Sequence, residues 1–228
     1  MGEKVSFASN GGTCEGYLAV PKSGNGPGVI VIQEWWGLVG HITAIADRFA
    51  EAGFVALAPD LYHGVVAQEP DQAMKMLMGL AMDKAALDIG GAARYLNERN
   101  DVTGRGIGSV GFCMGGSLAL WSATLSPEII ATVAFYPGLP WVRMTPVWQN
   151  YSGKSALIHA SESDGTSKAP GIQEAVEAIQ TSGGRIECFD YPGTHHAFFN
   201  DGRPEVYNAE AAKVAWERTI TFFNAMIS

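Results

Sequence analysis

A cysteine flanked by glycines carries the clearest chemical signal in the sequence. Cys113 stands at the centre of Gly111-Phe-Cys-Met-Gly115, directly after a β-branched apolar run and before an apolar segment that favours a helix. A Gly-x-nucleophile-x-Gly turn between a strand and a helix holds its central residue in a strained conformation, and the glycines let the chain pass closely. The amides at the start of the following helix would favour a thiolate. Taken alone, such a cysteine is more often a small core residue.

Two later segments supply the groups that would activate a cysteine. Asp164 follows a predicted strand, with Glu162 as a nearby rival, and the adjacent histidines His195 and His196 follow another strand through a Pro-Gly turn. Acyl transfer by a nucleophile needs a histidine base and a carboxylate that orients the base. Because each candidate follows a strand, and because the order is nucleophile, acid, histidine, the sequence predicts a catalytic triad.

The elements that must position these residues alternate between strands and helices. A hairpin around Asn10-Gly11 precedes them. Apolar runs predict strands, and spacings of three and four predict helices. The expected strands are 5–7, 13–19, 28–33, 54–58, 107–112, 129–135, 155–160 and 185–191; the expected helices are 41–52, 73–82, 84–98, 117–125, 170–180 and 205–225. This order predicts a single α/β domain over residues 1–228, with a mostly parallel twisted sheet and helices on both faces. Ligands of such sheets bind beyond the carboxyl ends of the strands.

Composition excludes several classes of partner. The net charge of −8 disfavours nucleic acids and anionic membranes. No signal peptide or membrane-spanning run is visible, and three widely spaced cysteines match neither a disulfide framework nor a zinc motif. We therefore expect a cytoplasmic protein with no nucleic-acid or membrane partner and no metal or organic cofactor. Its oligomeric state, monomer or small homo-oligomer, is left open.

Four stretches carry a resemblance to a known family: Val31-Ile-Gln-Glu-Trp-Trp-Gly-Leu38, Ala56-Leu-Ala-Pro-Asp-Leu-Tyr62, Val110-Gly-Phe-Cys-Met-Gly-Gly116 and Tyr191-Pro-Gly-Thr-His-His-Ala-Phe198. With them the sequence resembles the dienelactone hydrolase (carboxymethylenebutenolidase) family of the α/β-hydrolase superfamily, and the likeness runs nearly end to end. The resemblance implies an α/β-hydrolase fold. It also implies a triad of Cys113, Asp164 and His196, which favours His196 over His195.

The resemblance implies further site residues. Glu34 would pair with the cysteine and act as a switch, since a nearby carboxylate keeps a thiol protonated. Backbone amides of Trp35 and Met114 would form the oxyanion hole. The expected substrate pocket comprises Trp36, Tyr62, His63, Phe198 and Asn200. Residues 136–153 and 61–70 are expected to fold over it.

One departure concerns substrate recognition. The family uses two arginines to hold a substrate carboxylate, and the corresponding positions lie near His63 and at Asn200. Arg143 or Arg203 are the alternatives that the chain offers. The expected function is thus cysteine-dependent hydrolysis of a small-molecule lactone or ester. A carboxylesterase or thioesterase acting on a neutral substrate is the alternative, and a catalytically idle binding protein of the same fold is a third reading.

Overall fold

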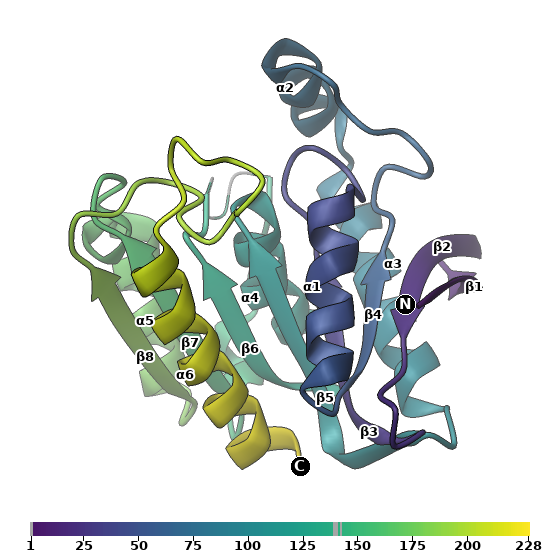
Figure 1. Ribbon diagram of the computed structural model, residues 1–228. Coiled ribbons are helices and arrows are strands. Elements are labelled where there is room, and N and C mark those ends of the chain that lie inside the picture. The colour runs from purple at the N-terminus through teal and green to yellow at the C-terminus, as the bar shows by residue number, and fades with distance from the viewer. Residues whose placement is uncertain (1, 139–140, 142) are drawn as a thin grey trace.

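A computed structural model describes residues 2–138, 141 and 143–228 of the chain. Its described strands form one eight-stranded sheet in the order β1-β2-β4-β3-β5-β6-β7-β8 (Figure 1). The strands are β1 (Glu3–Ser9), β2 (Gly12–Ala19), β3 (Gly26–Ile32), β4 (Val55–Pro59), β5 (Val102–Phe112), β6 (Ile129–Phe135), β7 (Ser155–Ser161) and β8 (Arg185–Tyr191). All predicted strands are present.

The sheet is antiparallel at one edge and parallel elsewhere. β1 pairs with β2, and β2 with β4, in antiparallel register, whereas the pairs from β4 to β8 are parallel. The β1–β2 hairpin turns at Asn10 and Gly11, which both have positive φ angles of 49° and 74°. These angles explain the Asn-Gly pair, because the two residue types tolerate the left-handed region best.

Helices cover both faces of the sheet. They are α1 (Gly40–Glu51), α2 (Pro70–Gly79), α3 (Met82–Asn97), α4 (Met114–Leu125), α5 (Pro170–Thr181) and α6 (Ala209–Ile227), with short 3-10 turns at Trp148–Tyr151 and Thr166–Lys168. One hydrophobic core lies between the sheet and α1 and α6, and the other lies between the sheet and α3, α4 and α5. Figure 1 shows α1 and α6 on the near face. The predicted fold class, an α/β-hydrolase-like sheet with helices on both sides, is confirmed.

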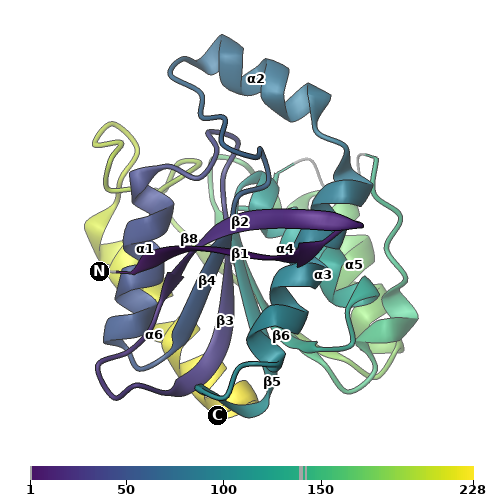
Figure 2. The ribbon, with the colours of Figure 1, turned by 90° about the vertical axis from the view of Figure 1, so that its right-hand side faces the viewer.

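Helix α2 is shifted by three residues from its predicted boundaries. It begins at Pro70 and ends at Gly79, earlier than the expected 73–82, because Pro70 starts the first turn and Leu80 is extended (ψ 122°). The helix projects beyond the carboxyl ends of the strands and stands apart from the sheet (Figure 2). Arg143 donates hydrogen bonds of 2.9–3.0 Å to the carbonyl oxygens of Leu77, Met78 and Leu80, and so fixes the end of the helix.

Other element boundaries also differ from the predicted ones. β5 begins at Val102, five residues before the expected start, and its pairing with β6 shifts register between Ile107 and Gly108. The expected covering segment 136–153 includes a 3-10 turn, while its residues 139–140 and 142 lie outside the described residues. Among the described helices, none is long and apolar enough to cross a bilayer.

Candidate active site

Cys113 occupies a strained turn between β5 and α4. Its φ and ψ angles are 55° and −119°, a conformation that a non-glycine residue adopts only where its surroundings enforce it. A methyl group on Gly111 would lie 1.9 Å from the carbonyl oxygen of Gly115, and one on Gly115 would lie 2.4 Å from that of Gln33. The glycines of the motif are therefore required by close backbone contact. The turn leaves the Cys113 side chain partly exposed at the amino end of α4.

Asp164 and His196 lie together although separate loops carry them. His196 Nδ1 lies 2.6 Å from Asp164 Oδ2, and Ser161 Oγ donates to the same oxygen. Glu162, the rival acid, accepts a hydrogen bond of 2.7 Å from the Gly193 amide, so it joins the two loops. His195 is exposed. The arrangement thus pairs Asp164 with His196 and gives Glu162 a loop-bracing contact.

The imidazole of His196 also contacts the cysteine. A methyl group on Gly138 would lie 3.5 Å from Cys113 Sγ and 3.9 Å from His196 Cε1, so both groups border the same space. Burial lowers the pKa of His196, but hydrogen bonds with Asp164 and Cys113 outweigh it and raise the pKa to about 10. Burial raises the pKa of Asp164, yet its bonds with His196 and Ser161 leave that pKa below the ordinary value. The three side chains can hold a thiolate–imidazolium pair.

Glu34 is a buried carboxylate beside this group. It is 2% exposed, and its described hydrogen bonds come from Asn200 Nδ2 at 2.9 Å and from the Tyr136 hydroxyl at 3.5 Å. The Tyr136 ring centroid lies 5.1 Å from that of His196. Burial, followed by the charges of Glu34 and Cys113, raises the pKa of Tyr136 well above its ordinary value, so Tyr136 stays a neutral donor. Asn200 therefore binds Glu34 rather than facing a ligand.

A cavity of about 350 Å³ opens above the cysteine. Its walls come from the loop after β3, the start of α4, the histidine loop and α2. The lining residues are Glu34, Trp35, Trp36, Met74, Leu77, Met78, Cys113, Met114, Gly138, His196, Ala197 and Arg203. The cavity is mostly apolar apart from the chemical groups at its floor, and such pockets suit small organic ligands.

Comparison with known proteins assigns the chain to a family. Residues 14–227 match the family model described as the dienelactone hydrolase family. The chain belongs to the dienelactone hydrolase family. As a member of it, the protein is a hydrolase that acts on lactone or ester bonds.

Relatives of this hydrolase match it over their full length. "Protein usf" of Aquifex pyrophilus is 36% identical, and the "Putative carboxymethylenebutenolidase" of Aquifex aeolicus is 32% identical; each match covers 100% of both chains. A solved structure from Klebsiella pneumoniae, titled "Putative Dienelactone Hydrolase", has a TM-score of 0.80 at 26% identity and covers 98% of each chain.

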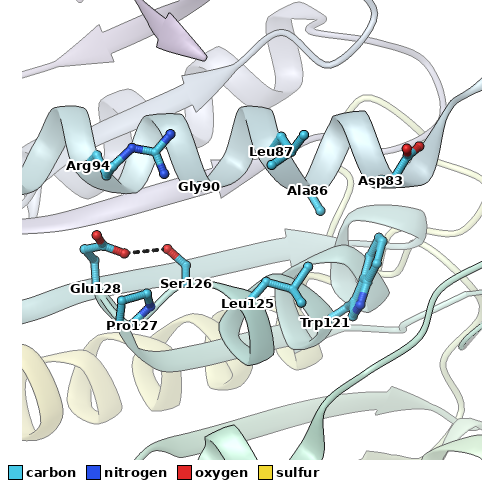
Figure 3. A pocket seen from close by; sticks show the side chains of 10 residues that line it. All are labelled: Asp83, Ala86, Leu87, Gly90, Arg94, Trp121, Leu125, Ser126, Pro127 and Glu128. Atoms are coloured by element: carbon cyan, nitrogen blue, oxygen red, sulfur yellow. Dashed lines mark hydrogen bonds between the residues drawn. The ribbon is translucent and has the colours of Figure 1, made fainter. Parts of the chain in front are cut away.

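A second cavity of about 330 Å³ in this dienelactone hydrolase family member lies between α3 and α4 (Figure 3). Trp121, Leu87 and Leu125 give it an apolar lining, and Arg94 and Glu128 lie at one end. Its lining residues include neither a cysteine nor a histidine. Cys113 and His196 therefore single out the cavity above Cys113 as the candidate active site.

The predicted pocket residues of this hydrolase divide into two groups. Trp36 lines the cavity, and the Tyr62 hydroxyl lies beside it, 3.7 Å from Met114 Sδ. Phe198 is instead fully buried in the core on the α1 and α6 face, and His63 contacts Asp88 on another side of the β4 loop. The structure thus places these two side chains, and that of Asn200, away from the cavity lining: His63 lies against Asp88, Phe198 lies in the core, and Asn200 binds Glu34.

The contribution of α2 to the cavity of this hydrolase is not predicted by the sequence. Met74, Leu77 and Met78 form one wall of the cavity, although their spacing resembles that of any amphipathic helix. Arg203 also lines the cavity, whereas Arg143 holds the end of α2. The sequence offers one weak signal of this wall, because its pattern provides no face against which the methionines would pack.

Proposed function

We propose that the protein hydrolyses a lactone or ester by acyl transfer through Cys113, with His196 as base and Asp164 as its orienting carboxylate. The observation that carries the proposal is the His196 imidazole, which is bonded to Asp164 at 2.6 Å and borders Cys113 Sγ on the cavity floor. An activated nucleophile needs this chain of contacts.

The first half-reaction forms a thioester. The Cys113 thiol gives its proton to His196, and the thiolate sulfur attacks the carbonyl carbon of the substrate. The oxyanion would accept hydrogen bonds from the amides of Trp35 and Met114, two residues that line the cavity. The carbon–oxygen bond of the ester then breaks, and the imidazolium returns the proton to the alkoxide. In a lactone this alcohol stays attached to the acyl group.

The second half-reaction restores the enzyme. His196 removes a proton from a water molecule, whose oxygen attacks the thioester carbon. The carbon–sulfur bond breaks, a carboxylic acid forms, and the sulfur regains its proton from the imidazolium. Asp164 keeps the imidazole in the required orientation and stabilises its cation in both halves. No redox step or external reactant other than water enters this cycle.

Glu34 is proposed to restrain the resting cysteine. Its carboxylate borders the same cavity as Cys113, and a nearby negative charge disfavours a thiolate. Asn200 and Tyr136 supply the hydrogen bonds that keep this carboxylate buried. A substrate that displaced Glu34 from these donors would relieve the restraint at the moment of binding.

For the substrate, the cavity favours an apolar and neutral molecule. Trp35, Trp36 and the α2 methionines dominate the walls. Among the described lining residues Arg203 is the only arginine or lysine, and its Nε atom is engaged by Glu205 at 2.9 Å. The described part of the cavity lining therefore lacks the two free arginines that would hold a substrate carboxylate. This supports hydrolysis of a neutral ester, the carboxylesterase alternative, over hydrolysis of a carboxylated dienelactone.

A trapping experiment tests the nucleophile. The protein is mixed with a chromogenic small ester, quenched in acid and analysed by peptide mass spectrometry. We expect a burst of product and an acyl adduct on the peptide that contains Cys113. Cys113→Ala should lose both, while Cys188→Ala, which removes another half-buried thiol, should keep both. An adduct elsewhere, or full turnover by Cys113→Ala, would refute the proposal.

Substrate preference needs a matched pair. A lactone bearing a carboxylate and the same lactone bearing a primary carboxamide have similar shapes and differ in charge at the group of interest. We expect higher kcat/KM for the neutral member, and we expect Arg203→Gln to change the ratio less than about 3-fold because Glu205 engages Nε and solvent screens the guanidinium. A strong preference for the carboxylate that Arg203→Gln abolishes would contradict this assignment.

A further inference from the structure

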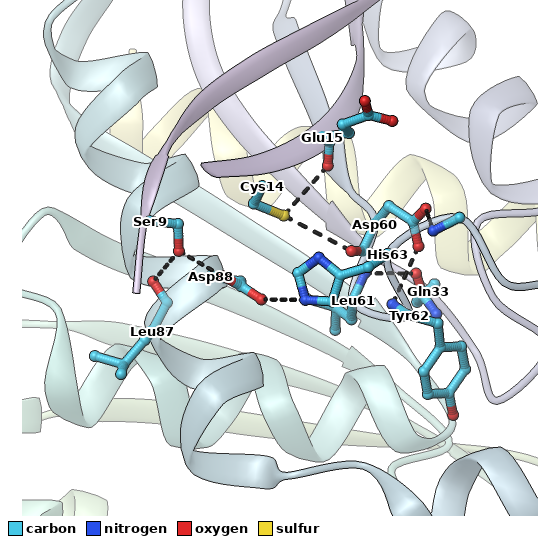
Figure 4. A network of polar contacts seen from close by, with 11 residues as sticks. Ser9, Cys14, Glu15, Gln33, Asp60, Leu61, Tyr62, His63, Leu87 and Asp88 are labelled. Atoms are coloured by element: carbon cyan, nitrogen blue, oxygen red, sulfur yellow. Dashed lines mark hydrogen bonds and ion pairs between the residues drawn. The ribbon is translucent and has the colours of Figure 1, made fainter. Parts of the chain in front are cut away.

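A second cluster of reactive side chains lies away from the catalytic cysteine. Cys14 comes from β2, His63 from the loop after β4, and Asp88 from α3 (Figure 4). Their sulfur, nitrogen and oxygen atoms all lie within 4.8 Å of one another, although the three residues are far apart in the sequence. The tertiary fold therefore assembles a donor set that sequence spacing does not reveal.

The loop that carries His63 is shaped to present the imidazole. Asp60 accepts hydrogen bonds from the backbone amides of Tyr62 at 3.1 Å and Gly64 at 2.6 Å, which closes the turn. His63 itself has a φ angle of 51°, a region that non-glycine residues seldom occupy. Its ring consequently turns toward Asp88, with Nε2 at 3.2 Å from Oδ2. Figure 4 shows the ring between Cys14 and Asp88.

Asp88 is a buried carboxyl group whose two oxygens differ in their contacts. Its side chain is 2% exposed, and Ser9 donates a hydrogen bond to Oδ1. Oδ2 is buried, and among the described residues it has no hydrogen bond, only the ion-pair contact with His63. Burying a carboxylate in this way is unfavourable unless a cation accompanies it. The oxygen is directed into the cluster, where such a cation would lie.

The donor types identify the cation. We propose that Cys14, His63 and Asp88 bind a divalent cation of the zinc class, with water as the fourth ligand. Thiolate and imidazole donors select Zn²⁺ over Mg²⁺ or Ca²⁺, which prefer oxygen. Bond lengths of about 2.0–2.3 Å in a tetrahedral site place donors roughly 3.3–3.8 Å apart. The cluster must therefore contract by about 1 Å at its longest separation, which a rotation of the Cys14 side chain can supply.

Binding requires the thiol to lose its proton to solvent. In the metal-free cluster burial, together with the charge of Asp88, raises the pKa of Cys14 to about 12, so the sulfur is a thiol that donates weakly to the carbonyl oxygens of Glu15 and Asp60. The cation replaces the proton on sulfur. His63 is 57% exposed, which leaves one side of the cluster open to the incoming ion and to the water ligand.

A second catalytic triad is the competing reading of these residues. Cys14 is fully buried, with no surface available to an ester carbonyl, whereas Cys113 borders a cavity. A thiol in this environment is a poor nucleophile, because the reactive form is the thiolate. The cation would instead join β2, α3 and the loop that leads into α2, and so stabilise the support of the cavity wall.

Cobalt(II) is a suitable probe because thiolate coordination produces a charge-transfer band. The double variant Cys113→Ala/Cys188→Ala leaves Cys14 as the only thiol. We expect this protein to bind one Co²⁺ with the thiolate band and to gain thermal stability with Co²⁺ or Zn²⁺, since a ligand that binds only the folded state raises Tm. No thiolate band, or a stoichiometry other than one, would overturn the proposal.

His63→Asn tests the ligand without endangering the fold. Asparagine tolerates a positive φ angle, and the side chain is largely exposed. We expect Co²⁺ affinity to fall at least 10-fold. The control is His195→Asn, an exposed histidine outside the cluster, which should leave the affinity unchanged. If both variants bind alike, the site is not at His63; if His63→Asn alone weakens binding, the assignment stands.

Discussion

Replacing Asp164 with asparagine separates the two roles of the carboxylate, because the amide side chain keeps the shape of the carboxylate and loses its charge. In the native protein the rise of the His196 pKa from 6.5 to about 10 corresponds to roughly 5 kcal/mol. Cys113 supplies part of this interaction, and the His196 side chain is 38% exposed, so solvent screening reduces the rest. We assign about half to Asp164, and the resulting ~2.5 kcal/mol predicts a loss of roughly 10²-fold in kcat/KM.

The pH profile provides a second readout. His196 keeps the proton that it takes from Cys113 at pH values below its raised pKa, so the imidazolium should persist until pH approaches about 10 and be lost above it. In Asp164→Asn the pKa falls, and the alkaline limb of kcat/KM should move to lower pH. The rate of Cys113 alkylation by iodoacetamide, measured across the same pH range, reports how His196 affects the reactivity of the sulfur without any turnover of substrate.

Two variants serve as matched controls. Ser161→Ala removes one donor to the same carboxylate but keeps its charge, and Glu162→Gln alters the rival acid that binds the Gly193 amide. Each should reduce kcat/KM by less than about 10-fold, the cost of one hydrogen bond. If Asp164→Asn retains native activity and an unmoved alkaline limb, or if Glu162→Gln has the larger effect, the reasoning fails.

Three further substitutions probe the packing around the site. Gly115→Ala would place a methyl carbon 2.4 Å from a backbone oxygen and should lower the free energy of unfolding by about 3 kcal/mol in urea titrations, whereas Gly79→Ala, in open space, should change it little. Asn200→Leu removes a donor at 2.9 Å from buried Glu34 and should cost about 2–3 kcal/mol; addition of Glu34→Gln should recover part of that loss. Arg143→Gln releases the end of α2 and should raise KM about 5-fold with little change in kcat, a loss of roughly 1 kcal/mol of hydrogen bonding. The packing argument would be contradicted if Gly115→Ala or Asn200→Leu had the same free energy of unfolding as the native protein, or if Arg143→Gln left KM unchanged.

The sequence predicts the elements well because local patterns determine them. Buried β-branched runs specify the parallel strands, and Asn10-Gly11 specifies the hairpin turn. The glycine motif also predicts the close backbone contacts around Cys113, since they lie within one strand–turn–helix unit. Asp164 and His196 are expected to be partners because parallel strands end at one edge, and their loops do meet there.

Side-chain directions in the loops are beyond sequence reasoning. The sequence places His63 in the pocket, but its positive φ angle turns it toward Asp88. Asn200 is expected to face substrate, but it satisfies the buried Glu34. Both outcomes depend on turn geometry and on a distant partner, neither of which leaves a periodic pattern. The wall formed by α2 likewise depends on the long-range contact with Arg143.

The position of α2 has a consequence for how specificity can diversify. This helix supplies a wall of the cavity, yet it lies outside the sheet; two connecting segments, the buried side chains of Ala73 and Leu77 and the Arg143 contacts join it to the rest of the fold. Mutations at Met74 or Met78, which are largely exposed, do not disturb the turn that carries the cysteine. Substitutions at these two positions can therefore change the shape of the cavity wall while the turn around Cys113 stays constant.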